Sequence, residues 1–142
     1  MTDGFTIEYV EKPEEAAWEI IGRGLDEHNR HQAGDMNFQR LCFSLSTPEG
    51  DIVGGVLGEM FWDWLHIDLM WIKEEFRGHG YGHQLLMAIE EEAKKRGARN
   101  IFLDTFSFQA PGFYEKQGYK VFGQLPDFPR GHTRFFLTKE LG

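Results

Sequence analysis

The sequence contains a single cysteine among its 142 residues, Cys42, which lies in the apolar run Leu41–Cys42–Phe43. One cysteine excludes an intrachain disulfide and a cysteine-based zinc site, and it is typical of a protein from a reducing compartment. Because the neighbours of Cys42 are hydrophobic, we expect a buried, unreactive thiol rather than a nucleophile.

Long apolar runs and positive charge are also scarce. No stretch approaches transmembrane length, and residues 1–10 lack the basic start and apolar core of a secretory signal. Lys and Arg number 15 against 23 Asp and Glu, which gives a net charge of −8. A nucleic-acid binder that relies on phosphate contacts carries the opposite balance. We therefore expect a cytoplasmic protein that binds neither nucleic acid nor a membrane, and a homodimer is left open.

The length fits one domain, which we expect to span residues 1–142. Hydrophobic periodicity predicts a strand at 5–10 and a helix that opens at Pro13 and breaks up over residues 28–36. The elements expected after that are strands at 40–46, 51–62 and 64–72, a helix at about 81–96, a strand at 99–106, a short helix at 111–117, and strands at 118–125 and 133–138. This order predicts an α/β fold, with a mixed sheet and helices on its faces.

The strand expected at residues 64–72 alternates strictly in the sequence. Simple alternation places two sets of side chains on opposite faces. One set is Leu65, Ile67, Leu69 and Trp71, and the other is His66, Asp68 and Met70.

A glycine-rich turn, Arg77-Gly78-His79-Gly80-Tyr81-Gly82, follows this strand and precedes an amphipathic helix. Glycines there allow positive φ angles and a close approach of backbone to ligand. The turn places several N–H groups at a helix N-terminus, which favours an anion, and Arg77 can add a charge-assisted bond. The pattern therefore predicts a ligand that carries phosphates, while the plain alternative is a turn that only joins strand to helix.

Three phosphate-binding patterns compete for this turn. A P-loop needs Lys followed by Ser or Thr after its last glycine, where His83 and Gln84 stand. A dinucleotide fingerprint counted from Gly78 needs glycine at His83. The remaining pattern, Arg/Gln-x-x-Gly-x-Gly/Ala, is met at Arg77, Gly80 and Gly82. It resembles the pyrophosphate signature of the GNAT acetyltransferases.

A second landmark of that family follows about 30 residues later. Residues 110–119, Ala-Pro-Gly-Phe-Tyr-Glu-Lys-Gln-Gly-Tyr, resemble its Ala, then Tyr, then Gly with an aromatic residue. The resemblance covers nearly the whole chain and is most specific from Trp64 to Tyr119, although Glu74 stands where many relatives have proline. It implies a GNAT fold, with a mixed, mostly antiparallel central sheet of six to seven strands flanked by about four helices.

The resemblance further implies acetyl-CoA as co-substrate and no metal. The pyrophosphate would lie on the amides of residues 78–82, and pantetheine in a gap between the strands that end near Ile72 and Phe106. Ser107 stands where relatives have an Asn that contacts pantetheine, and Gln109 could compensate for its shorter reach. The cofactor-binding residues so expected are Met70, Trp71, Ile72, Arg77, Gly78, His79, Gly80, Tyr81, Gly82, Ser107, Gln109 and Tyr114.

Tyr114, at the tyrosine position of the second landmark, is the expected general acid for the thiolate leaving group. A phenol, whose ordinary pKa is about 10, holds its proton at neutral pH. The alternative is that Tyr114 only packs against the sheet.

The residue that accepts the proton of the amine is less clearly marked. Some relatives carry Glu where His66 stands here, and an imidazole titrates close to neutrality. Asp68 could orient His66 or bind the amine, and Glu59 is a third option. Alternatively His66 is a hydrogen-bonded structural residue, as a histidine on a strand often is. The resemblance also allows a site without a dedicated base, because many family members work without one.

The sequence contains few features that indicate the acceptor. Aromatic residues could wall a cleft, with acidic side chains attracting a cation, although most such rings are more simply core. These residues are Phe61, Trp62, Trp64, Phe106 and Phe108, with Glu59, Asp68 and Asp104. Residues 28–36 and 127–132 either border the acceptor site or only connect elements.

We therefore expect an acetyl-CoA-dependent N-acetyltransferase that acts on a primary amine, of a small molecule rather than of a protein, by direct attack in a ternary complex. Two alternatives stay open. One is a non-catalytic acyl-CoA-binding sensor. The other is a nucleotide-binding module, which has no Walker-type lysine to support it.

Overall fold

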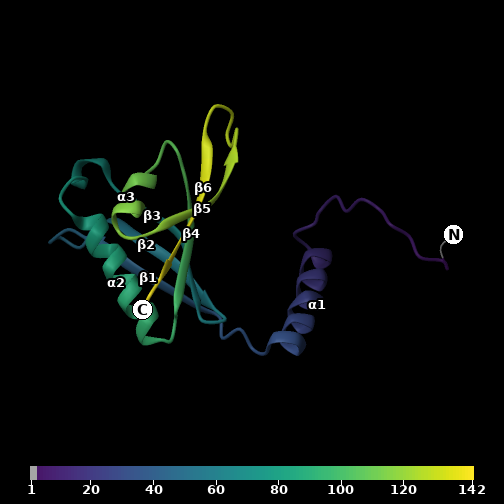
Figure 1. Cartoon of the computed structure of the whole chain (residues 1–142). Coiled ribbons are helices and arrows are strands. Elements are labelled where there is room, and N and C mark those ends of the chain that lie inside the picture. Colours follow the sequence, from purple (N-terminus) through teal and green to yellow (C-terminus); the bar gives the residue numbers. More distant parts are fainter. Residues whose placement is uncertain (1–2) are drawn as a thin grey trace. The chain divides into compact units, whose positions relative to one another are not determined.

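The computed structural model describes residues 3–142, which divide into two compact units, one ending at Met36 and the other spanning Asn37–Gly142 (Figure 1). The first unit contains one helix, α1 (Ala16–Ala33), which is uninterrupted where a break was predicted. Polar residues such as Arg30 and Gln32 favour helix, whereas Gly34, with φ 81°, ends it. The predicted break at 28–36 was therefore placed about six residues too early.

Residues 5–10 alternate as a strand should, yet they form neither strand nor helix in this unit. A strand is stable only when its backbone groups have a partner. Residues 3–36 offer no other strand to pair with. The predicted first strand is therefore wrong for this structure, although its pattern remains in the sequence.

The second unit is built on a six-stranded mixed sheet in the order β1-β2-β3-β4-β6-β5. Neighbouring strands pair antiparallel except for β3 and β4, which are parallel. The strands are β1 (Gln39–Ser46), β2 (Ile52–Phe61), β3 (Trp64–Ile72), β4 (Asn100–Phe106), β5 (Lys120–Pro126) and β6 (Thr133–Glu140). The α/β class is confirmed, and residues 3–142 contain six strands and three α-helices where six to seven strands and about four helices were expected.

Helices α2 (Tyr81–Lys95) and α3 (Pro111–Lys116) lie on one face of this sheet, and a 3₁₀ turn, Glu74–Phe76, links β3 to the glycine turn (Figure 1). Leu86 and Ile89 of α2 are almost completely buried against the strands. The core on this side comes mainly from α2 and from inward side chains of β1 to β4 and β6: Leu41, Val56, Met60, Leu65, Ile67, Leu85, Leu86, Ile89, Ala93, Ile101, Leu103 and Leu137.

The opposite face carries no helix from within residues 37–142. Side chains that alternate with the core positions point there, and several large apolar ones are exposed. The exposed fractions are 40% for Leu57, 49% for Leu69 and 52% for Trp71. We call this surface the open face.

Cys42 lies on the open face and is exposed, so the prediction of a buried thiol is wrong. Its neighbours Leu41 and Phe43 both turn toward the core. Successive strand residues point to opposite faces, so the side chain between two inward residues must point outward.

A β-bulge at Asp68 changes the pattern predicted for β3. Gly58 pairs with Ile67 and Leu57 with Leu69, which leaves Asp68 as an extra residue. The bulge shifts the alternation by one position. Leu65 and Ile67 therefore face the core together with Met70 and Ile72, whereas Leu69 and Trp71, which simple alternation places with Leu65 and Ile67, are exposed.

None of the helices within residues 3–142 is both long and apolar enough to cross a membrane.

Candidate functional site

The sheet opens between its two parallel strands. Pairing of β3 with β4 begins at Trp64 and Asn100 and ends at Ile67 and Leu103. Beyond that point β3 continues to pair with β2, and β4 continues with β6 as far as Phe106. The carboxyl ends of the two strands therefore share no ladder, which leaves peptide groups on their facing edges for another partner.

The glycine turn lies directly after the carboxyl end of β3. Gly78 and Gly80 have φ of 80° and 85°, and Gly80 is the N-cap of α2. Among the described residues no side chain caps this helix, and its first turn contains no acidic residue. Unpaired N–H groups at such a terminus favour an anion. The turn can therefore hold a phosphate group.

Gly78 and Gly80 are also open on the side where a β-carbon would be, since no atom lies within 4 Å of either position. Gly82 differs, because a β-carbon there would stand 3.5 Å from the Phe113 ring of α3. The glycines thus serve two purposes, which are access at residues 78 and 80 and helix packing at residue 82.

Arg77 does not extend freely from this turn. Its Nε donates a 2.7 Å hydrogen bond to the Ile72 carbonyl, at the end of β3. The guanidinium is thereby held beside the glycine turn, and the Ile72 carbonyl already has one partner. Nearby, His83 Nδ1 lies 2.6 Å from Gln117 Oε1, which joins the start of α2 to the end of α3.

Tyr114 is buried on α3, with 8% of its surface exposed. Its ring makes edge contacts with Phe113 and Tyr119, at centroid distances of 5.2 and 5.8 Å. Desolvation by burial raises the pKa of Tyr114 to about 12. The phenol therefore keeps its proton throughout the neutral range.

Tyr119, the aromatic residue that closes the second landmark, is held next to Tyr114 by two residues that the sequence did not single out, Glu90 and Lys139. The Tyr119 hydroxyl donates a 2.7 Å hydrogen bond to the buried carboxylate of Glu90, and Lys139 Nζ donates to its other oxygen at 3.0 Å. Burial and the Glu90 carboxylate both raise the pKa of Tyr119. The Tyr119 N–H also donates to the Tyr114 carbonyl at 3.1 Å. Glu90 could have been found from the sequence, because it is a charged residue on the apolar side of the predicted helix.

His66 and Glu59 face each other across β3 and β2. His66 Nδ1 lies 3.3 Å from Glu59 Oε1, and the His66 ring stacks on Phe102 at 4.6 Å. The contact to His66 thus comes from Glu59, while Asp68 occupies the bulge. Both members of the pair are only partly buried, with 22% of the His66 side chain and 32% of the Glu59 side chain exposed.

Ser107 and Gln109 are engaged in the loop that follows β4. The Thr133 N–H donates to Ser107 Oγ at 3.1 Å, and Ser107 Oγ lies 3.4 Å from His132 Nδ1. Gln109 Oε1 accepts from Thr105 Oγ1 and from the Phe106 N–H. Both side chains therefore fix the shape of the opening where β4 ends.

The aromatic residues that could have walled one cleft form two clusters. Phe61, Trp64 and His66 gather around Phe102, next to the paired part of β3 and β4. The second cluster lies at the carboxyl end of β4, where Phe106 stacks on Phe108 and Phe128 approaches Phe106. Trp62 lies in the β2–β3 turn with a left-handed φ of 46°.

Arg134, which the sequence did not single out, lies inside the second cluster. Its guanidinium lies 5.0–5.4 Å from the ring centroids of Phe106, Phe128 and Phe136. Its Nε donates a 2.9 Å hydrogen bond to Asp104, which raises the pKa of Arg134. The carboxylate of Asp104 is thereby largely compensated. Only the pairing of β6 with β4 reveals this contact, and no local pattern encodes that register.

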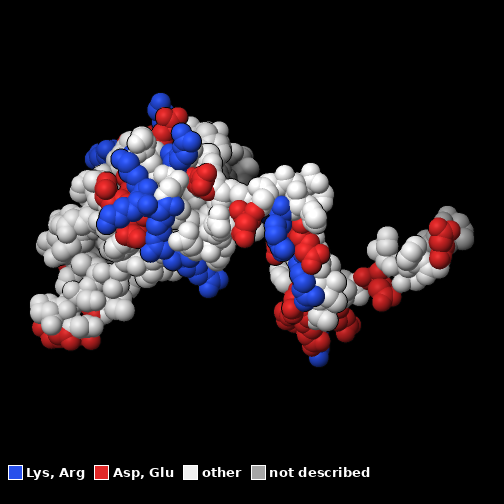
Figure 2. All heavy atoms as spheres, turned by 90° about the horizontal axis from the view of Figure 1, so that it is seen from below, with Lys and Arg blue, Asp and Glu red and all other residues white. Residues whose placement is uncertain are grey.

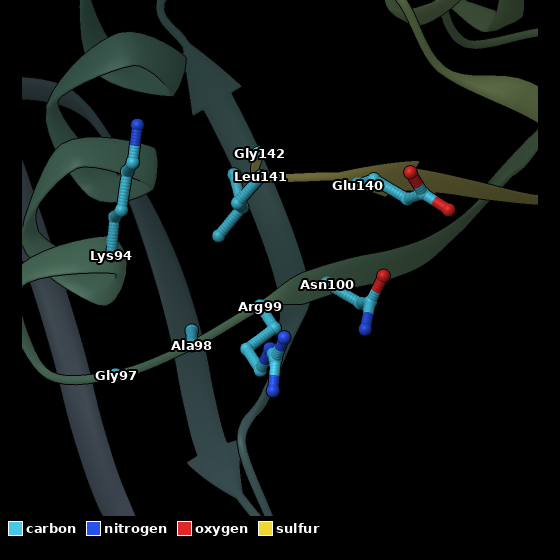
Figure 3. A pocket seen from close by; sticks show the side chains of 8 residues that line it. All are labelled: Lys94, Gly97, Ala98, Arg99, Asn100, Glu140, Leu141 and Gly142. Carbon is cyan, nitrogen blue, oxygen red and sulfur yellow. The ribbon is translucent and has the colours of Figure 1, made fainter.

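A hollow of about 790 Å³ lies elsewhere, where the end of α2 meets the start of β4 and the end of β6 (Figure 3). Lys94, Arg99 and Glu140 are among its lining residues. The 15 residues of α2 separate it from the glycine turn by roughly 22 Å. Within residues 3–142 no group of three or more His, Cys, Asp or Glu side chains is arranged to hold a metal ion.

Comparison with known proteins agrees with this geometry. The sequence pattern of the acetyltransferase (GNAT) family matches residues 6–119. The blasticidin-S acetyltransferase of Streptomyces morookaense is 41% identical over 93 residues, which are 65% of this chain and 68% of that protein. An acetyltransferase from Bacillus cereus, solved as a crystal structure, is 39% identical with a TM-score of 0.87 over 96% of this chain and 97% of its own.

A more distant Bacillus anthracis acetyltransferase shares the fold, and its crystal structure contains acetyl coenzyme A. It is 18% identical with a TM-score of 0.63, over 71% of this chain and 62% of its own. The family match extends from residue 6 through the glycine turn to Tyr119, and it agrees with the opened sheet and the uncapped α2. The chain therefore belongs to the acetyltransferase (GNAT) family.

Proposed function

We propose that this protein transfers the acetyl group of acetyl-CoA to a primary amine of a small molecule, by direct attack of the amine within a ternary complex. The observation that carries the proposal is the opening between β3 and β4 next to the uncapped N-terminus of α2. An anchor for phosphates and an open sheet edge in line with it suit a long ligand with a diphosphate at one end.

The residues around the glycine turn fit such a ligand. The amides of Gly78 to Gly82 would hold the diphosphate, since no atom lies within 4 Å of the open side of Gly78 or Gly80. Arg77, fixed by its bond to Ile72, would place positive charge beside them. The facing edges of β3 and β4, from Met70 to Ile72 and from Asp104 to Ser107, would bind the extended pantetheine arm as an added strand does.

The thioester end of acetyl-CoA would lie between a proton donor, Tyr114, and a proton acceptor, the Glu59–His66 pair. Acetyl-CoA supplies an activated acyl group as its thioester. Tyr114 holds a proton on its buried phenol at neutral pH and can donate it to a thiolate that leaves. A positioned acid is needed because burial makes an uncompensated thiolate costly.

Glu59 and His66 supply a proton acceptor on the open face. The carboxylate fixes the imidazole through Nδ1, which leaves Nε2 as the nitrogen that can accept a proton from an ammonium group. Asp68, exposed at the bulge, adds negative charge near the same strand and would favour a cationic acceptor.

Two observations support a small acceptor. The relative from Streptomyces morookaense is named for acetylating blasticidin S. In addition, the rings of Phe106, Phe108 and Phe128 cluster at the carboxyl end of β4, where they would offer an apolar contact to the ring system of a small acceptor.

The proposal is tested by the release of free CoA thiol from acetyl-CoA in the presence of a panel of amines that includes blasticidin S, polyamines and a lysine peptide. We expect release that depends on one class of small amine and increases in proportion to enzyme. Acetyl-CoA that stabilises the protein against heat, together with no release for any amine, would instead favour an acyl-CoA-binding sensor.

A further inference from the structure

The side chain of Arg134, on β6, is surrounded by aromatic rings. The ring centroids of Phe106, Phe128 and Phe136 lie 5.0–5.4 Å from its guanidinium carbon. On a further side, Asp104 accepts a 2.9 Å hydrogen bond from its Nε, and 28% of the Arg134 side chain is exposed. Ring faces attract a cation and pack against the flat guanidinium. The guanidinium of Arg134 therefore has a fixed position and orientation.

A positive charge alone does not distinguish Arg134. Figure 2 shows basic and acidic side chains interspersed over the face of the second unit that it draws, as is usual for a protein surface. Arg130, in the loop before β6, is a side chain of this exposed kind. Exposed charges that can move freely contribute little to binding. Arg134 differs from them because rings and a carboxylate hold it in place.

The outer nitrogens of Arg134 are accessible. Asp104 occupies Nε, whereas Nη1 and Nη2 make no hydrogen bond to any of residues 3–142. In this part of the chain no buried side-chain nitrogen or oxygen lacks a hydrogen-bond partner, so both Nη atoms reach the surface. The paired N–H donors of a guanidinium match the two oxygens of a carboxylate. Arg134 can therefore bind an anionic group in a defined direction.

Arg134 lies on the same face of the sheet as the proposed proton acceptor, His66. Phe102 and Asp104 flank the buried Leu103 on β4, so both point to the open face. The His66 ring stacks on Phe102 at 4.6 Å, and Arg134 is bonded to Asp104, just past the last residue of β4 that pairs with β3. Two residues of a strand span about 7 Å. The imidazole and the guanidinium are therefore about 7 Å apart along β4, beside the opening.

We propose that Arg134 is a specificity-determining residue that binds a carboxylate of the acceptor while the acceptor's amine lies at His66. This inference rests on the proposed function. The preferred acceptor is then an amine that carries a carboxylate about 7 Å from the reacting nitrogen. Glu59 and Asp68 attract its ammonium group, and Arg134 attracts its carboxylate. An amine without an anionic group makes no bond to Arg134 and binds less tightly.

The first test compares two acceptors of equal length at saturating acetyl-CoA. One is ε-aminocaproate, whose extended chain separates amine and carboxylate by the required distance, and the other is its uncharged amide, ε-aminocaproamide. We expect kcat/KM to be about tenfold higher for the carboxylate, since the amide cannot form the charge-assisted hydrogen bonds. Arg134→Gln should abolish this preference by raising the KM for ε-aminocaproate.

Arg130→Gln is the matched control, because it removes the same charge from an exposed side chain four residues away. It should keep the preference of the wild type. Arg134→Lys keeps the charge without the fork of donors, and it should retain only part of the preference. An equal loss of preference in Arg130→Gln and Arg134→Gln would assign the effect to the general charge of the surface and overturn the inference.

The second test measures binding without turnover. The protein is saturated with CoA, which carries no acetyl group, and is titrated with each compound while NMR follows the Arg134 Nε–H signal, assigned by its loss in Arg134→Lys. We expect ε-aminocaproate to shift this signal and ε-aminocaproamide to leave it in place. Such a shift without acetylation of either compound would support the carboxylate site and contradict the proposed function. Acetylation of both compounds with equal kcat/KM would support the proposed function and overturn this inference, as would a signal that ε-aminocaproate does not move.

Discussion

The phenol of Tyr114 is enclosed by Phe113 and Tyr119, and burial raises its pKa to about 12. Such a group holds its proton until negative charge develops on a neighbouring leaving group, and an uncompensated thiolate in a buried site is costly. Removing the hydroxyl should therefore slow the step in which the thiolate leaves, without disturbing the ring contacts.

For Tyr114→Phe we predict a fall in kcat of about 10²- to 10⁴-fold, the usual contribution of a positioned general acid. Binding of acetyl-CoA, measured by calorimetry, should stay within about threefold of wild type, since the glycine turn is untouched. An unchanged kcat would assign Tyr114 to packing alone.

The same pKa shift predicts how stability varies with alkaline pH. Between about pH 10 and pH 12 the unfolded chain loses the Tyr114 proton while the folded chain keeps it, so the free energy of unfolding falls as pH rises. The loss amounts to about 2–3 kcal/mol for a shift of about two units. Denaturant titrations at pH 9 and pH 12 measure it. Tyr114→Phe should lack this part of the loss, whereas equal slopes for the two proteins would contradict it.

The Glu59–His66 pair allows a separate test at the acceptor side. His66→Ala should lower turnover about 10²-fold or more and change the pH–rate profile, because the base is removed. Glu59→Gln keeps the hydrogen-bond acceptor but not the charge, and it should have a smaller effect. A profile of the same shape for wild type and His66→Ala would remove His66 from the mechanism.

For single residues, the sequence predicts candidates for the site but not the contacts that these candidates make. The family landmarks lie at Arg77 to Gly82 and at Tyr114 in the sequence, so no fold was needed to find them. Contacts such as Asp104–Arg134 and Glu90–Tyr119 join residues about 30 positions apart. The Asp68 bulge depends on the register with β2, which local alternation does not contain.

Among the elements, α2 has a glycine with positive φ at each end, and the one at its N-terminus belongs to the proposed cofactor site. Gly80 before the helix and Gly97 after it both have positive φ, 85° and 96°, and at neither glycine does any atom lie within 4 Å of the place that a β-carbon would take. An alanine at either position meets the same backbone strain, about 1–2 kcal/mol.

We predict that Gly80→Ala raises the KM for acetyl-CoA about tenfold, since the amides of the turn must move to relieve the strain. Gly97→Ala is the matched control. It should lose similar thermal stability and keep the wild-type KM. Steady-state kinetics with melting curves separates the two effects, and an equal rise in KM for both variants would show that general destabilisation is responsible.

The predicted bounds of the elements in the second unit lie within a few residues of the observed bounds. Each element has a clear hydrophobic periodicity, and turn-forming residues mark where it begins and ends. β3 was predicted with its observed bounds, Trp64–Ile72, and α2 within one residue of its observed end at Lys95. The N-terminal elements were less predictable. A strand at residues 5–10 requires a partner, and the end of α1 depended on one glycine rather than on a polar stretch.

At the scale of the whole molecule, the sheet has two faces that present different groups. The face with α2 and α3 contains the core and fixes the glycine turn and Tyr114, while the open face carries Glu59 and His66. The opening between β3 and β4 joins them. A thioester placed in that opening could thus meet an acid from one face and a base from the other.

The most direct test of the proposed cofactor site is a crystal structure of the protein in complex with acetyl-CoA. We predict that its diphosphate lies on the amides of Gly78 to Gly82 and its pantetheine between β3 and β4, with the thioester sulfur within hydrogen-bonding reach of the Tyr114 hydroxyl. Coenzyme bound at another place, such as the hollow near Arg99, or no binding at saturating concentration, would contradict the account.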